Sequence, residues 1–151
     1  IARYHPELSM DDRSDLVSLS DGSIGHALAL ADGAGVELYR DMINLFEALP
    51  SLDIEAVHKL GDKVARVGAE QSFQTLGELL RWWLGRLVIG GAGKGGQTHL
   101  MKRIFAQAGL DNWLEVWEKV NRMLERTDAV NLDRKQTILN IFLTLERTVR
   151  T

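Results

Sequence analysis

The segment QSFQTLGELLRWWLGRLVI, residues 71–89, holds the densest run of large apolar side chains in this chain. Its apolar residues recur every three or four positions, which is the spacing of one face of an α-helix. The stripe consists of Phe73, Leu76, Leu80, Trp83 and Leu87, and Leu79, Trp82 and Ile89 extend it around the helix. A helix with so wide an apolar surface is usually surrounded by other helices or by another subunit. We therefore expect this helix at the centre of a helical domain.

Helical spacing continues on both sides of this segment. Upstream, one stripe ends at Pro50 and Ser51 or Asp53 opens the next, which predicts an antiparallel helical hairpin. Downstream we expect a short helix at about 100–105, a helix at about 111–125, and a last helix that begins near Leu132 or Asp133. The expected interior residues are Leu38, Met42, Leu45, Phe46, Leu49, Ile54, Val57, Leu60, Val64, Val67, Leu100, Met101, Ile104, Phe105, Trp113, Val116, Trp117, Val120, Leu124, Ile138, Phe142, Leu145 and Val149. Because no segment alternates like a strand over a sufficient length, the sequence predicts an all-α, multi-helix bundle.

Composition excludes several classes of protein. The chain has 151 residues, 45% of them hydrophobic, which is enough for one good core. A net charge of −3 gives no electrostatic case for a dedicated nucleic-acid binder. The chain has no cysteine, and no apolar run approaches the roughly 18 residues of a membrane span. We expect a cytoplasmic protein, and the start at Ile1 suggests a piece of a longer one.

A second informative motif is DGSIGHAL, residues 21–28. Gly22 can end a helix in the left-handed conformation, and Ser23 can accept from the free amides that open the next. The motif resembles the second sensor in the helical lid of AAA+ clamp-loader proteins, where an arginine two residues after the serine reaches the ATP γ-phosphate. Gly25 stands at that position and has no side chain to offer. The resemblance therefore points to the delta-prime family of bacterial DNA polymerase III subunits, which do not hydrolyse ATP.

This resemblance covers nearly the whole chain and implies two parts. Residues 1–33 would be the remnant of an AAA+ lid, a short helical pair, and residues 34–151 a C-terminal collar domain, with the glycine-rich stretch 31–35 as the boundary. Asn131 to Phe142 is similar to the last collar helix of the family. The implied role is oligomerisation with the gamma/tau and delta subunits in the pentameric loader that places the sliding clamp on primed DNA. The parent would belong to a DNA-directed DNA polymerase (nucleotidyltransferase) holoenzyme without a catalytic site of its own, and no cofactor is expected here.

Motifs for catalysis or metal binding are weak. The loop at 90–96, GGAGKGG, follows a predicted helix and lacks the Ser or Thr after Lys94 that a phosphate loop requires, so we interpret it as a flexible connection. His5, His26, His58 and His99 lack the spacing of metal ligands. A helix-turn-helix built on residues 24–31 would present no side chain that reads bases. No nucleophile elbow and no acid/base pair can be picked out, so we predict neither catalytic nor metal-binding residues.

Five residues are our candidates for a subunit interface. Trp82 and Trp83 point about 100° apart on one helix, so at least one of them could meet a partner. Arg81 lies beside them, and Arg134 and Lys135 form a basic start to the last helix. Two alternatives remain open: a bundle that binds a small molecule or acts as an enzyme in a pocket lined by the tryptophans, and a DNA-binding helical module.

Overall fold

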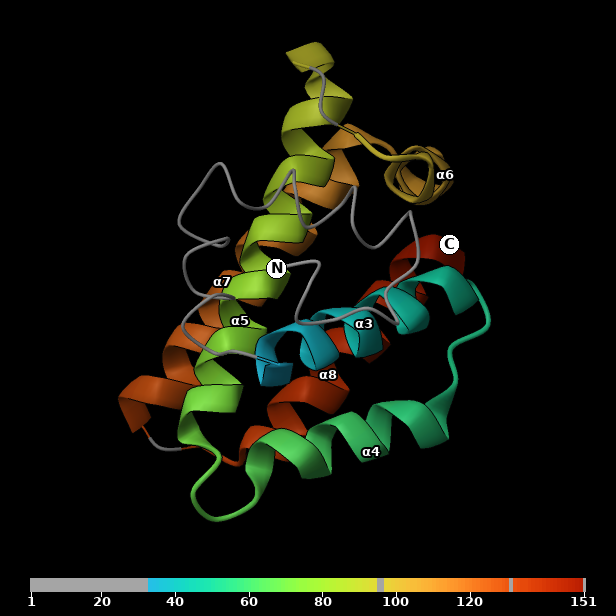
Figure 1. Ribbon diagram of the computed structural model, residues 1–151. Helices are drawn as coiled ribbons and strands as arrows, with labels where there is room; N and C mark the ends of the chain where they lie inside the picture. The colour runs from blue at the N-terminus through green and yellow to red at the C-terminus, as the bar shows by residue number, and fades with distance from the viewer. Residues whose placement is uncertain (1–32, 95–96, 131, 151) are drawn as a thin grey trace.

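The computed structural model describes residues 33–94, 97–130 and 132–150, and these ranges contain helices and no strand (Figure 1). The helices are α3 (Gly33–Ala48), α4 (Ile54–Ala65), α5 (Glu70–Ile89), α6 (His99–Ala108), α7 (Leu110–Val130) and α8 (Arg134–Arg150). The predicted all-α bundle is therefore confirmed for the described ranges. The lid-like motif at 21–28 lies outside them. Helix α3 already includes Gly33 and the buried Gly35, which we had expected in a linker.

Helix α5 is the centre of the bundle, as its sequence predicts. It contacts α3, α4, α6 and α7, and in Figure 1 it lies between α7 on one side and α3 on the other. The whole predicted stripe is buried, together with Leu79, Leu84 and Val88. Ile89, the last residue of the helix, is 48% exposed, although Leu87 and Val88 in the same turn are buried. The apolar side chains around this helix are thus covered mostly by other helices of the same chain.

The connection between α3 and α4 is held by side chains from elsewhere in the chain. Arg103 on α6 donates to the carbonyl oxygens of Leu49 (2.9 Å) and Glu47 (3.1 Å). Glu146 on α8 accepts from the Leu52 amide at 3.1 Å, and Arg150 donates to the Pro50 carbonyl at 3.0 Å. Backbone groups with no helical partner are therefore satisfied by three charged side chains.

Helix α4 begins as predicted but buries less of its stripe. The Asp53 carboxylate accepts from the Ala56 amide at 3.1 Å, which is an N-cap. Val57, Leu60 and Val64 are buried, chiefly against α8. The prediction was wrong for Ile54, which is 46% exposed, and for Val67, which is fully exposed beyond the end of the helix. Both lie outside the span that faces the bundle.

The first part of the glycine loop is an ordered turn. Gly90–Lys94 continues α5 as a wider π-type turn, and Gly93 there has φ +90°. A Cβ on Gly91 would stand 1.9 Å from a ring atom of Phe105, so only glycine fits this approach of the turn to α6. The Thr98 hydroxyl then caps α6 by accepting from the Met101 amide at 3.2 Å. This geometry replaces the flexible loop that we expected over residues 90–94.

Helices α7 and α8 close the bundle with the inner faces that their sequences predict. The predicted interior residues of both helices are buried, except that Trp117 is half-buried. Two buried hydroxyls, on Thr127 and Thr137, bond each other at 2.6 Å where the helices meet. Gly85 lets α7 approach α5 closely, since a Cβ there would lie 3.3 Å from Trp117. In the described part of the chain, no helix has the length and apolarity to cross a membrane.

Candidate functional site

The two adjacent tryptophans of α5 lie in different environments. Trp83 is 2% exposed, and its ring centroid is 4.3 Å from that of Phe46 on α3. It is a core residue that no partner can reach without unfolding the bundle. The interface prediction is therefore wrong for Trp83, because the 100° step between neighbouring residues turns its ring inward.

Trp82 and Arg81 lie on the half-exposed outer side of α5. The backbone of Arg81 is fixed from α7, because the Trp117 indole N–H donates to the Arg81 carbonyl oxygen at 3.1 Å. The Arg86 guanidinium carbon lies 5.7 Å from the centroid of the Trp82 ring, which is a cation–π distance. We name the surface formed by Trp82, Arg86 and Ile89, which lie at neighbouring positions on one side of the helix, the α5 ridge.

Sequence reasoning missed Arg86. The available signal was its position four residues after Trp82, since residues at i and i+4 on a helix are neighbours. Its Nε atom is closed off from solvent and has no hydrogen-bond partner in the part of the chain that the structure describes. The Arg86 guanidinium is therefore positioned by its packing on Trp82. No carboxylate of the described residues forms an ion pair with it.

Arg134 and Lys135 are occupied within the chain. Arg134 donates to the carbonyl oxygens of Ala65 (3.3 Å) and Arg66 (3.4 Å) at the end of α4, and lies 3.9 Å from the Glu70 carboxylate. Lys135 pairs with Asp62 on α4 at 2.8 Å. Both side chains join α8 to α4. These contacts stabilise the fold, and a role of the two residues at a subunit interface stays a prediction.

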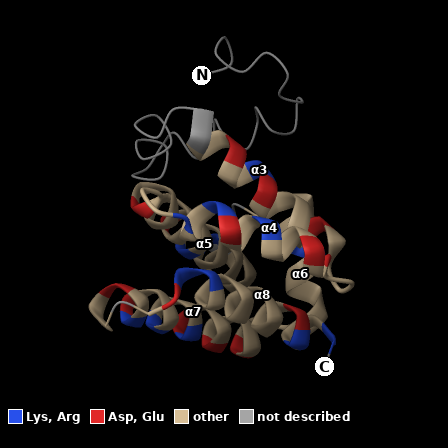
Figure 2. Cartoon of the chain, turned by 90° about the horizontal axis from the view of Figure 1, so that it is seen from below, with Lys and Arg blue, Asp and Glu red and all other residues tan. Residues whose placement is uncertain are grey.

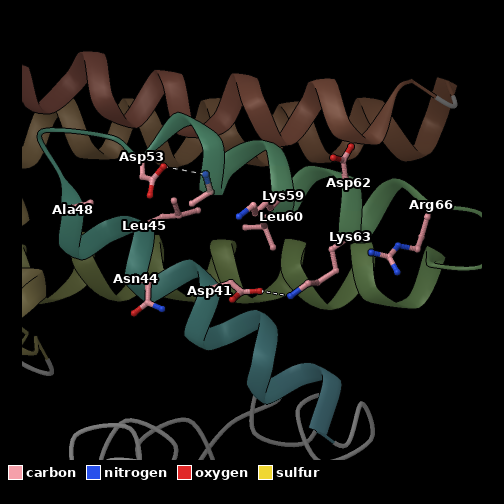
Figure 3. A pocket seen from close by; sticks show the side chains of 11 residues that line it. Asp41, Asn44, Leu45, Ala48, Asp53, Lys59, Leu60, Asp62, Lys63 and Arg66 are labelled. Carbon is pink, nitrogen blue, oxygen red and sulfur yellow. Dashed lines mark hydrogen bonds and ion pairs between the residues drawn. The ribbon is translucent and has the colours of Figure 1, made fainter.

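A groove of about 560 Å³ runs between α3 and α4 (Figure 3). Leu45, Ala48, Ala56 and Leu60 supply its apolar lining. Its charged lining includes three aspartates and three basic residues: Asp41, Asp53, Asp62, Lys59, Lys63 and Arg66. No tryptophan lines this groove, so the tryptophan-lined pocket that we considered does not match it.

Charges in the groove are largely paired. Lys63 donates to Asp41 at 2.6 Å and to Glu37 at 3.0 Å. Partial burial alone would lower the pKa of Lys63, but the hydrogen bonds and charges of Asp41 and Glu37 outweigh it, so this pKa is raised. The hydrogen bond from Lys135 lowers the pKa of Asp62. In both pairs the fold favours the charged forms, as structural ion pairs do.

Other candidate chemistry is scattered. His58 and His99 are exposed on different helices, and the described residues contain no group of three or more side chains that could hold a metal ion. Gly25, His5 and His26 lie outside the described residues. The α5 ridge combines a half-exposed tryptophan, an exposed isoleucine and an arginine without an acidic partner among the described residues.

Comparisons of the chain with protein-family models, curated proteins and solved structures gave no match. The fold class and the geometry above are consequently the basis for any functional conclusion, together with the motifs of the sequence.

Proposed function

We propose that this chain is the assembly part of a delta-prime-type subunit of the bacterial DNA polymerase III clamp loader, and that it acts in the cytoplasm during DNA replication. The observation that carries the proposal is the order of the chain. A lid-like motif at residues 21–28, with Gly25 in place of the sensor arginine, precedes an all-helical bundle that starts at α3. That order is the one in which clamp-loader subunits join a lid to a collar.

In this proposal residues 34–151 are a collar domain and residues 1–33 the remnant of a lid. The collar binds the gamma/tau and delta subunits side by side, and heterologous contacts of that kind can close a ring. Through the ring the chain contributes indirectly to placing the sliding clamp on primed DNA. It neither hydrolyses ATP nor carries a catalytic site of its own.

The proposal is tested by mixing the purified chain with gamma/tau and delta subunits and measuring complex formation by size-exclusion chromatography with light scattering. We expect a complex that contains all three subunits. Arg81→Glu should weaken it, whereas Arg126→Glu, at an exposed position on α7, should not. Arg134 is unsuitable for this test because its reversal would disturb the end of α4. Elution of the chain alone under all conditions would refute the proposal.

A second function is favoured by the groove between α3 and α4. Its volume and mixed lining are compatible with a small polar molecule, so the chain could be a ligand-binding bundle or an enzyme. A thermal-shift screen separates the two functions, since a ligand that binds the folded state raises Tm. Stabilisation by a metabolite supports this alternative, and stabilisation by partner subunits alone supports the collar.

A further inference from the structure

We infer that the Trp82–Arg86 pair of the α5 ridge is the contact by which this chain recognises a carboxylate-bearing helix of a neighbouring loader subunit. The inference rests on the proposed function and adds the chemistry of the contact. It assigns the central role to Arg86, whose guanidinium lies over the Trp82 ring at 5.7 Å.

The cation of the α5 ridge has no acidic partner among the described residues. No acidic side chain lies within ion-pair distance of Arg81 or Arg86 in the described residues. By contrast, Lys63, Arg134 and Lys135 each have an acidic neighbour within 4.0 Å. Among the described residues Arg86 is therefore a cation without an acidic partner, and a carboxylate can accept two parallel hydrogen bonds from one guanidinium.

Apolar side chains accompany Arg86 on the α5 ridge. Trp82 is only partly buried, and Ile89 on the next turns of the same helix is 48% exposed. Tryptophan and arginine are enriched among the residues that contribute most to protein–protein binding, especially where apolar neighbours exclude water. A partner helix with one carboxylate among apolar residues matches this combination of side chains.

A protein partner fits this surface better than a nucleic acid. A phosphate backbone requires a continuous basic stripe, because affinity depends on several phosphate contacts at once. Figure 2 shows acidic and basic positions interspersed along the described helices, and the ridge itself includes one arginine, Arg86, with Glu78 one turn before Trp82. The charge pattern is thus that of a local contact with a carboxylate.

The test uses the full chain and purified gamma/tau and delta subunits, with affinities measured by biolayer interferometry. Arg86→Met keeps the aliphatic stem on Trp82 and removes the charge. We expect it to weaken binding to one neighbouring subunit by roughly 10- to 100-fold, with helical circular dichroism and Tm retained. Arg126→Met, at an exposed position on α7, is the matched control and should bind the subunits as the wild type does.

The outcomes separate this inference from the proposed function. If wild type and Arg86→Met bind the subunits equally, the inference is overturned while the collar assignment stands. If wild type binds no loader subunit, both are overturned. Recovery of Arg86→Glu binding by a partner in which one interface Glu or Asp is changed to Lys would support the inference. Binding of the ridge to a DNA duplex, lost in Arg86→Met, would contradict it.

Discussion

The glycines of the bundle differ in what their missing side chains allow. A Cβ on Gly77 would meet Leu124 at 3.5 Å, an ordinary contact, whereas one on Gly91 would overlap the ring of Phe105. Gly91→Ala should therefore lower the free energy of unfolding by about 1–3 kcal/mol, the cost of overpacking. Gly77→Ala is the matched control and should be neutral or stabilising by up to about 1 kcal/mol, since alanine favours the helix. Urea titration measures the free energy of unfolding of both variants. Equal changes in the two variants would show that Gly91 is not in close contact with Phe105 on α6.

Lys63 gives a prediction about pH. Its pKa is raised in the folded chain, so the stabilisation from its ion pairs is fully present below its ordinary pKa of 10.5 and is lost as pH rises through the folded value. Asp41→Asn should move the pKa of Lys63 downward, because one of its two acidic partners is gone. NMR titration of the Lys63 Cε resonance measures this shift. An unchanged pKa in Asp41→Asn would mean that the 2.6 Å contact is not formed in solution.

At the scale of the elements, Arg134 connects the start of α8 to the end of α4. Arg134→Ala should lower the free energy of unfolding by about 1.5–3 kcal/mol, since it removes hydrogen bonds from a charged donor to helix-terminal carbonyls. Arg126→Ala on the exposed side of α7 should change it by less than about 0.5 kcal/mol. Denaturant unfolding compares the two variants. A neutral Arg134→Ala would show that these hydrogen bonds do not contribute to the stability of the bundle.

The α3–α4 connection depends on Arg103 in the same way. Arg103→Met keeps most of the volume of the side chain and removes the donors to Leu49 and Glu47. We expect faster amide hydrogen exchange in residues 49–53, with exchange in α7 unchanged, because local openings need not unfold the bundle. Mass spectrometry of the exchanged peptides reports both regions. Uniform acceleration over the chain would indicate global destabilisation instead.

Much of the element pattern could be predicted from the sequence. The stripes of α5, α7 and α8 are long and regular, so helical spacing alone identifies their buried faces. Ile54 and Val67 were misassigned because spacing does not show where the contact between two helices ends. The contacts of Arg134 and Lys135 within the chain could not be predicted, because their partners, at the end of α4, are about 70 residues away in sequence. Arg86 was missed because an arginine on a helix is ordinarily a solvated residue.

At the scale of the whole molecule, α5 has two functions in this account. Its inner side is the centre of the fold, where Trp83 packs on Phe46, and its half-exposed side carries the α5 ridge, which we propose binds a partner. In this proposal the two adjacent tryptophans have different roles, Trp83 in stability and Trp82 in assembly.

The most direct test of this division is denaturant unfolding of Trp82→Ala and Trp83→Ala, measured side by side. Trp83→Ala should lose about 3–5 kcal/mol, the range for a large aromatic removed from a core. Trp82→Ala should lose less than half as much and keep the helical circular dichroism of the wild type. If Trp82→Ala proves as destabilising as Trp83→Ala, the outer side of α5 belongs to the core and the central claim is contradicted.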